Sequence, residues 1–145
     1  MVHRFALRVY YEDTDLAGIV YYANYLKFIE RGRSEWLRDL GIDQMRIKAE
    51  TGVVFAVRRL EADYLRPAQF GEDLLVETVL HELGGSRIAL VQKVLRDTVV
   101  LFEAKVLLAC IGPRGPTRLP PDLRLRLQGQ AAQGEAAPTG PDPAG

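Results

Sequence analysis

The chain has 145 residues, of which 48% are hydrophobic and 26% are charged, and its 19 Lys and Arg balance its 19 Asp and Glu. This composition is typical of a single globular domain. Zero net charge gives no general attraction to nucleic acid or to an anionic membrane, so we expect neither partner. One cysteine excludes an internal disulfide framework, and two histidines leave little for a metal site, so we expect no metal.

The two ends of the chain bear on location and on domain boundaries. The first residues turn polar too early for a signal peptide, and the longest apolar run is far shorter than a membrane helix, so we expect a cytoplasmic protein. Residues 128–145 contain only Gln, Gly, Ala, Pro, Glu, Thr and Asp. Burial therefore cannot offset the entropy of ordering them. We expect a folded domain over residues 1–127 and a disordered tail over residues 128–145.

The first predicted elements are a strand and a long helix. Residues 5–11 place apolar side chains on one face, which predicts the strand. The helix is indicated by an apolar stripe at Tyr25, Ile29, Gly32, Trp36 and Leu40, and Gly41 ends it. A glycine in mid-helix costs ~1 kcal/mol relative to alanine, so Gly32 predicts a close approach between the helix and a neighbour.

Strand patterns dominate the rest of the domain. After a short segment at residues 42–50, the expected strands are residues 52–65, 74–83, 87–96 and 99–111. The last one alternates most clearly, and its apolar face includes Cys110, which we expect to be buried and not a nucleophile. Short loops join antiparallel neighbours. The expected fold class is therefore α+β, with one long helix against an antiparallel sheet of about five strands.

The segment between the first strand and the long helix is the one region whose residue types suggest catalysis. It contains Asp13, Thr14 and Asp15, residue types that usually form turns or cap helices. Asp15 stands too far upstream of a helix start near Tyr22 to be an ordinary N-cap. Residues 18–21 are mostly apolar, and a poorly solvated carboxylate beside them is poised to act as a base or nucleophile. The residues alone leave both interpretations open.

Residues 13–25, DTDLAGIVYYANY, resemble the signature of hotdog-fold acyl-CoA thioesterases of the 4-hydroxybenzoyl-CoA thioesterase group, which includes the Tol-Pal-associated thioesterases. The resemblance continues through residues 30–35, 63–68 and 71–73. It implies a hotdog fold, in which a curved antiparallel sheet wraps one long helix. It also implies a homo-oligomer, a dimer paired edge to edge or a tetramer, that hydrolyses an acyl-CoA to free acid and coenzyme A without a cofactor.

The same resemblance assigns roles to individual residues. The catalytic aspartate of the family falls on Asp15, as nucleophile or general base. The oxyanion donor, a backbone N–H at the start of the long helix, falls on Tyr22, and helix N-termini do present unpaired N–H groups. Gly18 and Val20 fall beside the acyl group. Tol-Pal-associated members usually have histidine where this chain has Tyr22, and 4-hydroxybenzoyl-type members have tyrosine, so the acyl preference stays open.

Arginine is the predominant basic residue, with 15 Arg against four Lys. Guanidinium groups suit phosphate, so Arg58, Arg59, Arg66 and Arg87 are candidates to bind the phosphates of coenzyme A, although most of them are explained equally by charges on the outer face of the sheet. Of the four, we expect Arg59, Arg66 and Arg87 to bind the phosphates. After removal of the tail, whose charged residues are Glu135 and Asp142, the domain keeps 19 basic groups against 17 acidic ones. Such a mildly basic domain suits a polyanionic thioester.

Other functions and residues compete with this interpretation. A non-catalytic acyl-CoA sensor of the same fold is the main alternative, and contact with acyl carrier protein or an envelope complex is compatible with either role. A hotdog dehydratase would need a loop histidine, and none lies between residues 4 and 80. Glu30 and Glu35 are alternative bases, although exposed ion pairs explain them better, and His3 and His81 are isolated.

Overall fold

The computed structural model describes the backbone of residues 1–136 and the side chains of residues 1–130. It contains a six-stranded antiparallel sheet in the order β1-β3-β4-β5-β2, with the short β6 paired to β5. The strands are β1 (His3–Arg8), β2 (Val54–Tyr64), β3 (Asp73–Leu83), β4 (Arg87–Arg96), β5 (Val99–Gly112) and β6 (Gly115–Pro116). The helices are α1 (Asn24–Asp39), α2 (Gln44–Thr51) and α3 (Pro121–Ala136), with a 3₁₀ turn at Tyr11–Asp13. Within residues 1–136, no helix is both long and apolar enough to cross a membrane.

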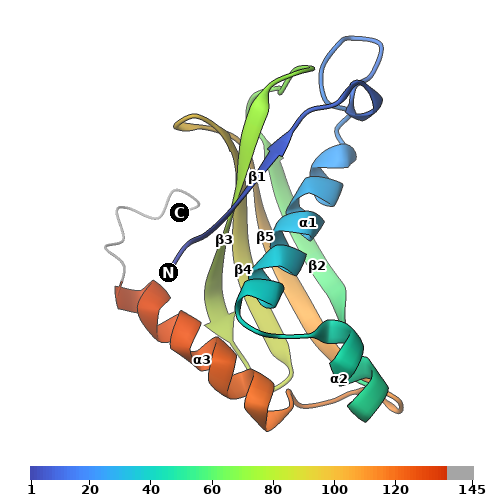
Figure 1. The fold of residues 1–145 in the computed structure, drawn as a ribbon, viewed down its shortest axis with the longest axis vertical. Helices are drawn as coiled ribbons and strands as arrows, with labels where there is room; N and C mark the ends of the chain where they lie inside the picture. Colours follow the sequence, from blue (N-terminus) through green and yellow to red (C-terminus); the bar gives the residue numbers. More distant parts are fainter. Residues whose placement is uncertain (137–145) are drawn as a thin grey trace.

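The long helix α1 packs against one face of the sheet, which curves behind it (Figure 1). Its apolar side contacts β1, β3 and β4. Gly32 makes the closest approach, because a Cβ added to it would lie 2.5 Å from Cγ1 of Val76 in β3. The buried residues of the helix are Tyr25, Phe28, Ile29, Gly32, Trp36 and Leu37. The expected α+β fold and the expected close approach at Gly32 are both confirmed.

The first strand is shorter at its end than the pattern predicts. It ends at Arg8, and the chain then enters the 3₁₀ turn at Tyr11–Asp13. The carboxylate of Asp13 accepts the Tyr10 N–H at 2.8 Å. Such local bonds from an aspartate to the backbone compete with the hydrogen bonds of a sheet. Residues 5–8 of the predicted strand therefore lie in the sheet, whereas residues 9–11 do not.

Two helices are present that the patterns above do not predict. Helix α2 begins after Asp43, whose side chain accepts the Arg46 N–H at 3.1 Å, and ends at Gly52 with a φ of 74°. Helix α3 buries Leu123 and Leu127 and contacts β3.

Helix α3 also bears on the expected tail. It continues to Ala136, past the expected domain boundary at residue 127, so residues 128–136 of the expected disordered tail are helical. Alanine and glutamine are good helix formers and favour this extension of a helix anchored by its leucines, while Gly129 and Gly134 each oppose it by ~1 kcal/mol. The remaining part of the expected tail, residues 137–145, lies outside the described residues.

The edge strand β2 pairs with β5 on one side, and no described strand pairs with its other side. Most of its side chains are exposed, including Val57 at 48% and Tyr64 at 47%. An edge of this kind presents unpaired N–H and C=O groups beside apolar side chains. Strand β2 is therefore a surface suited to pairing with a strand of another chain.

Candidate active site

Asp15 lies in a tight loop between β1 and α1. Its N–H donates to the Ile19 carbonyl at 2.9 Å, and the Gly18 N–H donates to the Asp15 carbonyl at 3.0 Å. Gly18 has a φ of 82°, in the left-handed region that favours glycine, and no atom lies within 4 Å of a Cβ built on it. The turn itself therefore requires Gly18, and the space around Gly18 is open.

The two aspartates of this segment have different surroundings. Asp13 is buried, and its carboxylate is engaged by the Tyr10 N–H. Asp15 is exposed. Its Oδ1 accepts the Ala17 N–H at 2.9 Å, and its Oδ2 has no hydrogen-bond partner among the described residues. Asp15 is therefore the aspartate with an oxygen available to a water or a substrate.

Neither aspartate caps α1. The N-cap residue is Ala23, which makes no side-chain cap hydrogen bond, and the first turn contains no acidic residue. The inference that Asp15 lies too far upstream to cap the helix is therefore confirmed, and its bond to the Ala17 N–H gives it the place in a turn that its residue type favours. The poor solvation expected for Asp15, by contrast, is absent from the single chain, because Asp15 and the adjacent Leu16 are exposed to solvent.

The start of α1 presents free backbone donors. The N–H groups of Tyr22 and Ala23 have no acceptor among the described residues. The Tyr21 N–H, by contrast, donates to the Asp13 carbonyl at 2.9 Å, and Asn24 Nδ2 donates to the same carbonyl at 2.9 Å. These two bonds join the Asp15 loop and the helix start into one unit. Free N–H groups at the positive end of a helix attract a developing negative charge.

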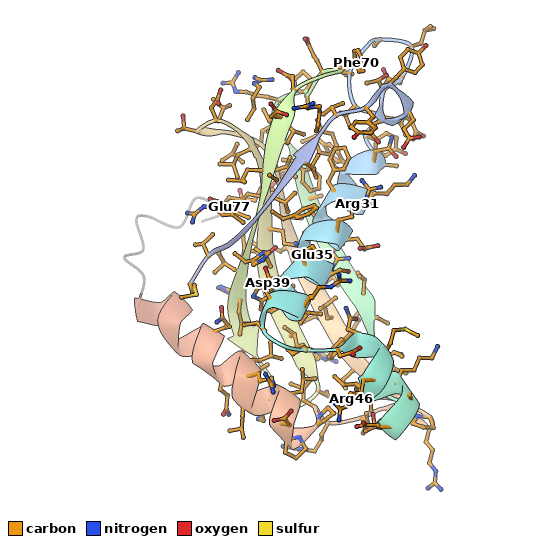
Figure 2. The ribbon with its side chains drawn as sticks, in the orientation of Figure 1. Arg31, Glu35, Asp39, Arg46, Phe70 and Glu77 are labelled. Atoms are coloured by element: carbon orange, nitrogen blue, oxygen red, sulfur yellow. The ribbon has the colours of Figure 1, made fainter. Side chains whose placement is uncertain are left out.

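A second loop, residues 66–72, holds this unit from the sheet side. The Val20 N–H donates to the Ala68 carbonyl at 2.8 Å, and the Ala68 N–H donates to the Tyr25 hydroxyl of α1 at 3.0 Å. Figure 2 shows Phe70 of this second loop at the end of the molecule that carries the Asp15 loop. The loop that carries Asp15 is therefore held by hydrogen bonds to the helix start and to the second loop.

Aromatic side chains surround the start of the helix. The hydroxyl of Tyr64, the last residue of β2, donates to the Tyr22 carbonyl at 2.9 Å. The Tyr64 ring packs edge-on against Phe102 with centroids 4.9 Å apart. Sequence patterns give Tyr64 no role, and its place in the family-like segment 63–68 is the one signal that could have drawn attention to it.

Among the predicted binding residues, Val20 and Arg59 have clearly different surroundings. Val20 is buried in the core, so its side chain is covered in the single chain. Arg59 is exposed on β2, and its guanidinium pairs with Glu61 at 2.6 Å. An exposed pair of this kind contributes little to stability, so it leaves Arg59 free to exchange partners.

Arg66 and Arg87 lie at opposite ends of the sheet. Arg66 follows β2 and belongs to the second loop, beside the Asp15 unit. Arg87 opens β4 next to the turn at Gly84, whose carbonyl accepts Arg124 Nη1 of α3 at 2.8 Å. Figure 1 shows α3 at the end of the molecule opposite the Asp15 loop. Within one chain, Arg87 is therefore separated from Asp15 by the length of the sheet.

The other candidate residues make ordinary structural contacts. Glu30 accepts the Ser34 hydroxyl at 3.1 Å, and His3 Nε2 lies 2.7 Å from Asp39 Oδ2. Cys110 is buried, and burial raises the pKa of its thiol, which disfavours the reactive thiolate. Among the described residues, no group of three or more His, Cys, Asp or Glu is arranged to hold a metal ion.

A curved antiparallel sheet around one long helix is the architecture of the hotdog fold. The chain belongs to the Thioesterase-like superfamily, whose family model matches residues 9–127.

Individual relatives are similar over most of the chain. An acyl-CoA thioesterase, YbgC, from Haemophilus influenzae is 40% identical over 122 residues, which cover 83% of this chain and 90% of that protein. An acyl-CoA thioester hydrolase, YbgC, from Escherichia coli O6:H1 is 38% identical over 111 residues, or 76% and 82% of the two chains. The crystal structure of a probable thioesterase from Bartonella henselae has a TM-score of 0.79 at 41% identity and covers 83% of this chain and 100% of that one. The expected family is confirmed, and it is a family of thioester hydrolases.

Proposed function

We propose that the protein hydrolyses the thioester of an acyl-CoA to a free acid and coenzyme A. In this proposal Asp15 is the nucleophile or general base, and the Tyr22 N–H polarises the thioester carbonyl. The observation that carries it is a free carboxylate oxygen and a free backbone N–H on one hydrogen-bonded unit of loop and helix. The similarity to proteins named as acyl-CoA thioesterases supports the substrate class.

The chemistry follows from these two groups. When a water activated by Asp15, or the carboxylate itself, attacks the thioester carbon, negative charge develops on the carbonyl oxygen. One N–H donor aimed at this charge contributes about 2.7–4 kcal/mol, and a positioned base contributes about 10²–10⁴-fold in rate. The C–S bond then breaks, and the sulfur leaves as the thiol of coenzyme A. It takes the proton that Asp15 removed from water in the general-base route, and a proton from solvent water in the nucleophilic route. In the nucleophilic route, water subsequently hydrolyses the acyl group from Asp15.

The active unit is a dimer joined through β2 in this proposal. Two features of the chain support it, namely the exposed edge of β2 and the exposure of Asp15, which an enzyme of this chemistry covers when substrate binds. Antiparallel pairing of two β2 strands extends the sheet across both chains. It also places, beside the Asp15 loop, the end of the partner's sheet that lies opposite the partner's own Asp15 loop. A tetramer then forms from two such dimers.

The phosphates of coenzyme A bind to arginines in this proposal. Arg66 lies at the same end of the sheet as the Asp15 loop, and Arg59 lies exposed on β2. In an antiparallel dimer, Arg87 of the partner subunit comes from the opposite end of its own sheet and therefore approaches this end. Guanidinium groups from both chains then surround the polyanion.

The dimer is tested by a charge placed on the edge of β2. Val57→Glu is expected to convert the protein to a monomer, because Val57 is a 48% exposed apolar residue of the β2 edge and a charge placed on an edge strand opposes its pairing with another strand. Sedimentation velocity measures the mass, and thiol release measures the accompanying loss of activity. Val99→Glu is the matched control, since Val99 is a 39% exposed valine at the start of β5. A dimer that persists in Val57→Glu contradicts this interface.

The proposed activity is tested by thiol release from acyl-CoAs with short aliphatic, long aliphatic and aromatic acyl groups. Turnover of one of these classes supports the proposal and identifies the acyl preference. Binding of an acyl-CoA without thiol release would favour the alternative, a non-catalytic acyl-CoA sensor. The unit that carries the activity is residues 1–127 in this proposal, which the family match over residues 9–127 supports.

The proposed location and protein partners are tested separately. We place the protein in the cytoplasm, and cell fractionation tests this location. Contact with acyl carrier protein or an envelope complex is a further proposal, which a pull-down from the native cell tests.

The role of the Tyr22 backbone is tested by Tyr22→Phe. Because the proposed donor is the N–H, removal of the hydroxyl is expected to lower kcat by less than about threefold, or less than ~1 kcal/mol. The Tyr22 side chain is 62% exposed, so the exchange has little effect on stability. Steady-state thiol release gives the comparison. A collapse of kcat would assign the chemistry to the hydroxyl instead.

A further inference from the structure

The backbone of Tyr22 is held by a single hydrogen bond. Its carbonyl accepts the Tyr64 hydroxyl at 2.9 Å and no other donor among the described residues. Tyr22 lies just before Ala23, the N-cap residue of α1. The peptide before Tyr22 is fixed separately, because the Asn24 N–H donates to the Tyr21 carbonyl at 2.8 Å. Tyr64 therefore holds the next peptide, which joins Tyr22 to Ala23 and carries the free Ala23 N–H.

The Tyr64 ring is placed by the core of the protein. Tyr64 pairs with Phe102 across β2 and β5, and their rings lie edge to face with centroids 4.9 Å apart. Phe102 is fully buried, and Tyr25 stacks on it at 5.1 Å. Tyr25 also lies edge-on to Tyr64 at 5.6 Å. The sheet and α1 thus set the direction of the Tyr64 hydroxyl.

The Tyr64 hydroxyl is a donor in its neutral form only. Burial, with a smaller effect of nearby Tyr22, raises the pKa of Tyr64 above its ordinary value of 10.0. At neutral pH the hydroxyl therefore keeps its proton and donates it to the Tyr22 carbonyl.

We propose that Tyr64 is a positioning residue for a second oxyanion donor, the free Ala23 N–H. By holding the Tyr22 carbonyl, it stops the peptide between Tyr22 and Ala23 from turning and keeps the Ala23 N–H, which belongs to that peptide, directed at the thioester oxygen. This inference rests on the proposed function of the helix start as the oxyanion site. A donor of this kind acts mainly on the transition state, so its misalignment lowers kcat more than it raises KM.

Tyr64→Phe tests the proposal, because it keeps the ring on Phe102 and Tyr25 and removes only the hydroxyl. We expect kcat for thiol release to fall about 3–10-fold, the equivalent of one lost hydrogen bond, with KM within about twofold of the wild type. The amide resonance of Ala23 is expected to shift in the variant without substrate, because its nitrogen shares a peptide with the Tyr22 carbonyl.

Tyr21→Phe is the matched control. The Tyr21 ring lies 5.0 Å from that of Tyr22, and its hydroxyl makes no hydrogen bond among the described residues. We expect its kcat to match the wild type. If Tyr64→Phe keeps the wild-type kcat, or changes KM alone, the role of Tyr64 is overturned while the proposed function stands. If the wild type releases thiol from no acyl-CoA, the proposed function fails, and this inference fails with it.

Discussion

Asp15→Asn is expected to lower kcat for thiol release by about 10³-fold or more and to leave the fold intact. The amide can neither accept a proton from water nor attack a thioester, so both proposed roles are lost. Asparagine has the same size, and its Oδ1 still accepts the Ala17 N–H that closes the turn at 2.9 Å. Because the side chain is exposed, the exchange leaves no buried polar atom unpaired. Thiol release at saturating acyl-CoA and circular dichroism measure the two expectations.

Asp13→Asn is the matched control for this result. It makes the same chemical exchange two residues away, at a carboxylate that is buried and engaged by the Tyr10 N–H. Loss of a charge-assisted hydrogen bond costs roughly 1–3 kcal/mol of stability. We expect this variant to unfold earlier and to keep kcat within about tenfold of the wild type. Near-normal turnover in Asp15→Asn, or a greater loss of kcat in Asp13→Asn, would reverse the assignment of the catalytic aspartate.

The long helix and strands β3, β4 and β5 could be predicted because each buries one side. The stripe from Tyr25 to Leu40 predicts α1, which the structure places at Asn24–Asp39, followed by Gly41 with a φ of 78°. The unusual cost of Gly32 in mid-helix also predicts its contact with β3, which the structure shows at Val76. One-sided burial imposes a period on the sequence, and that period survives in the fold.

Features with a weak sequence period, or with contacts between distant residues, could not be predicted in this way. Helix α3 and the residues just before it carry a buried leucine every fourth position, at Leu119, Leu123 and Leu127, but the polar residues between them and the composition after Leu127 obscure this signal. The bond from Tyr64 to Tyr22 joins residues 42 positions apart, which only the folded sheet brings together. The catalytic role proposed for Asp15 comes from the family resemblance. The neighbouring residues, which are mostly apolar, do not predict that Asp15 is exposed in the single chain.

Gly32→Ala is expected to lower the free energy of unfolding by about 1 kcal/mol and kcat by up to about 10²-fold. A Cβ at Gly32 would lie 2.5 Å from Val76 Cγ1 and 3.2 Å from its Cβ, so α1 must move away from β3. Such overpacking costs about 1–3 kcal/mol, and the helix propensity of alanine returns only ~1 kcal/mol. The start of α1 carries the Tyr22 N–H, and a misplacement of about 1 Å costs about 10² in rate. Chemical denaturation and thiol release measure the two effects.

Two further variants separate this contact from helix propensity. Gly129→Ala makes the same exchange in α3, where no atom lies within 4 Å of the added Cβ, so propensity acts alone and stability is expected to rise by ~1 kcal/mol. Val76→Ala opens the space that the new methyl group needs. Combined with Gly32→Ala, it is expected to be less destabilising than the sum of the two single changes, since residues in contact do not act additively. Additive effects, or a stable and fully active Gly32→Ala, would show that α1 does not depend on this contact for its position.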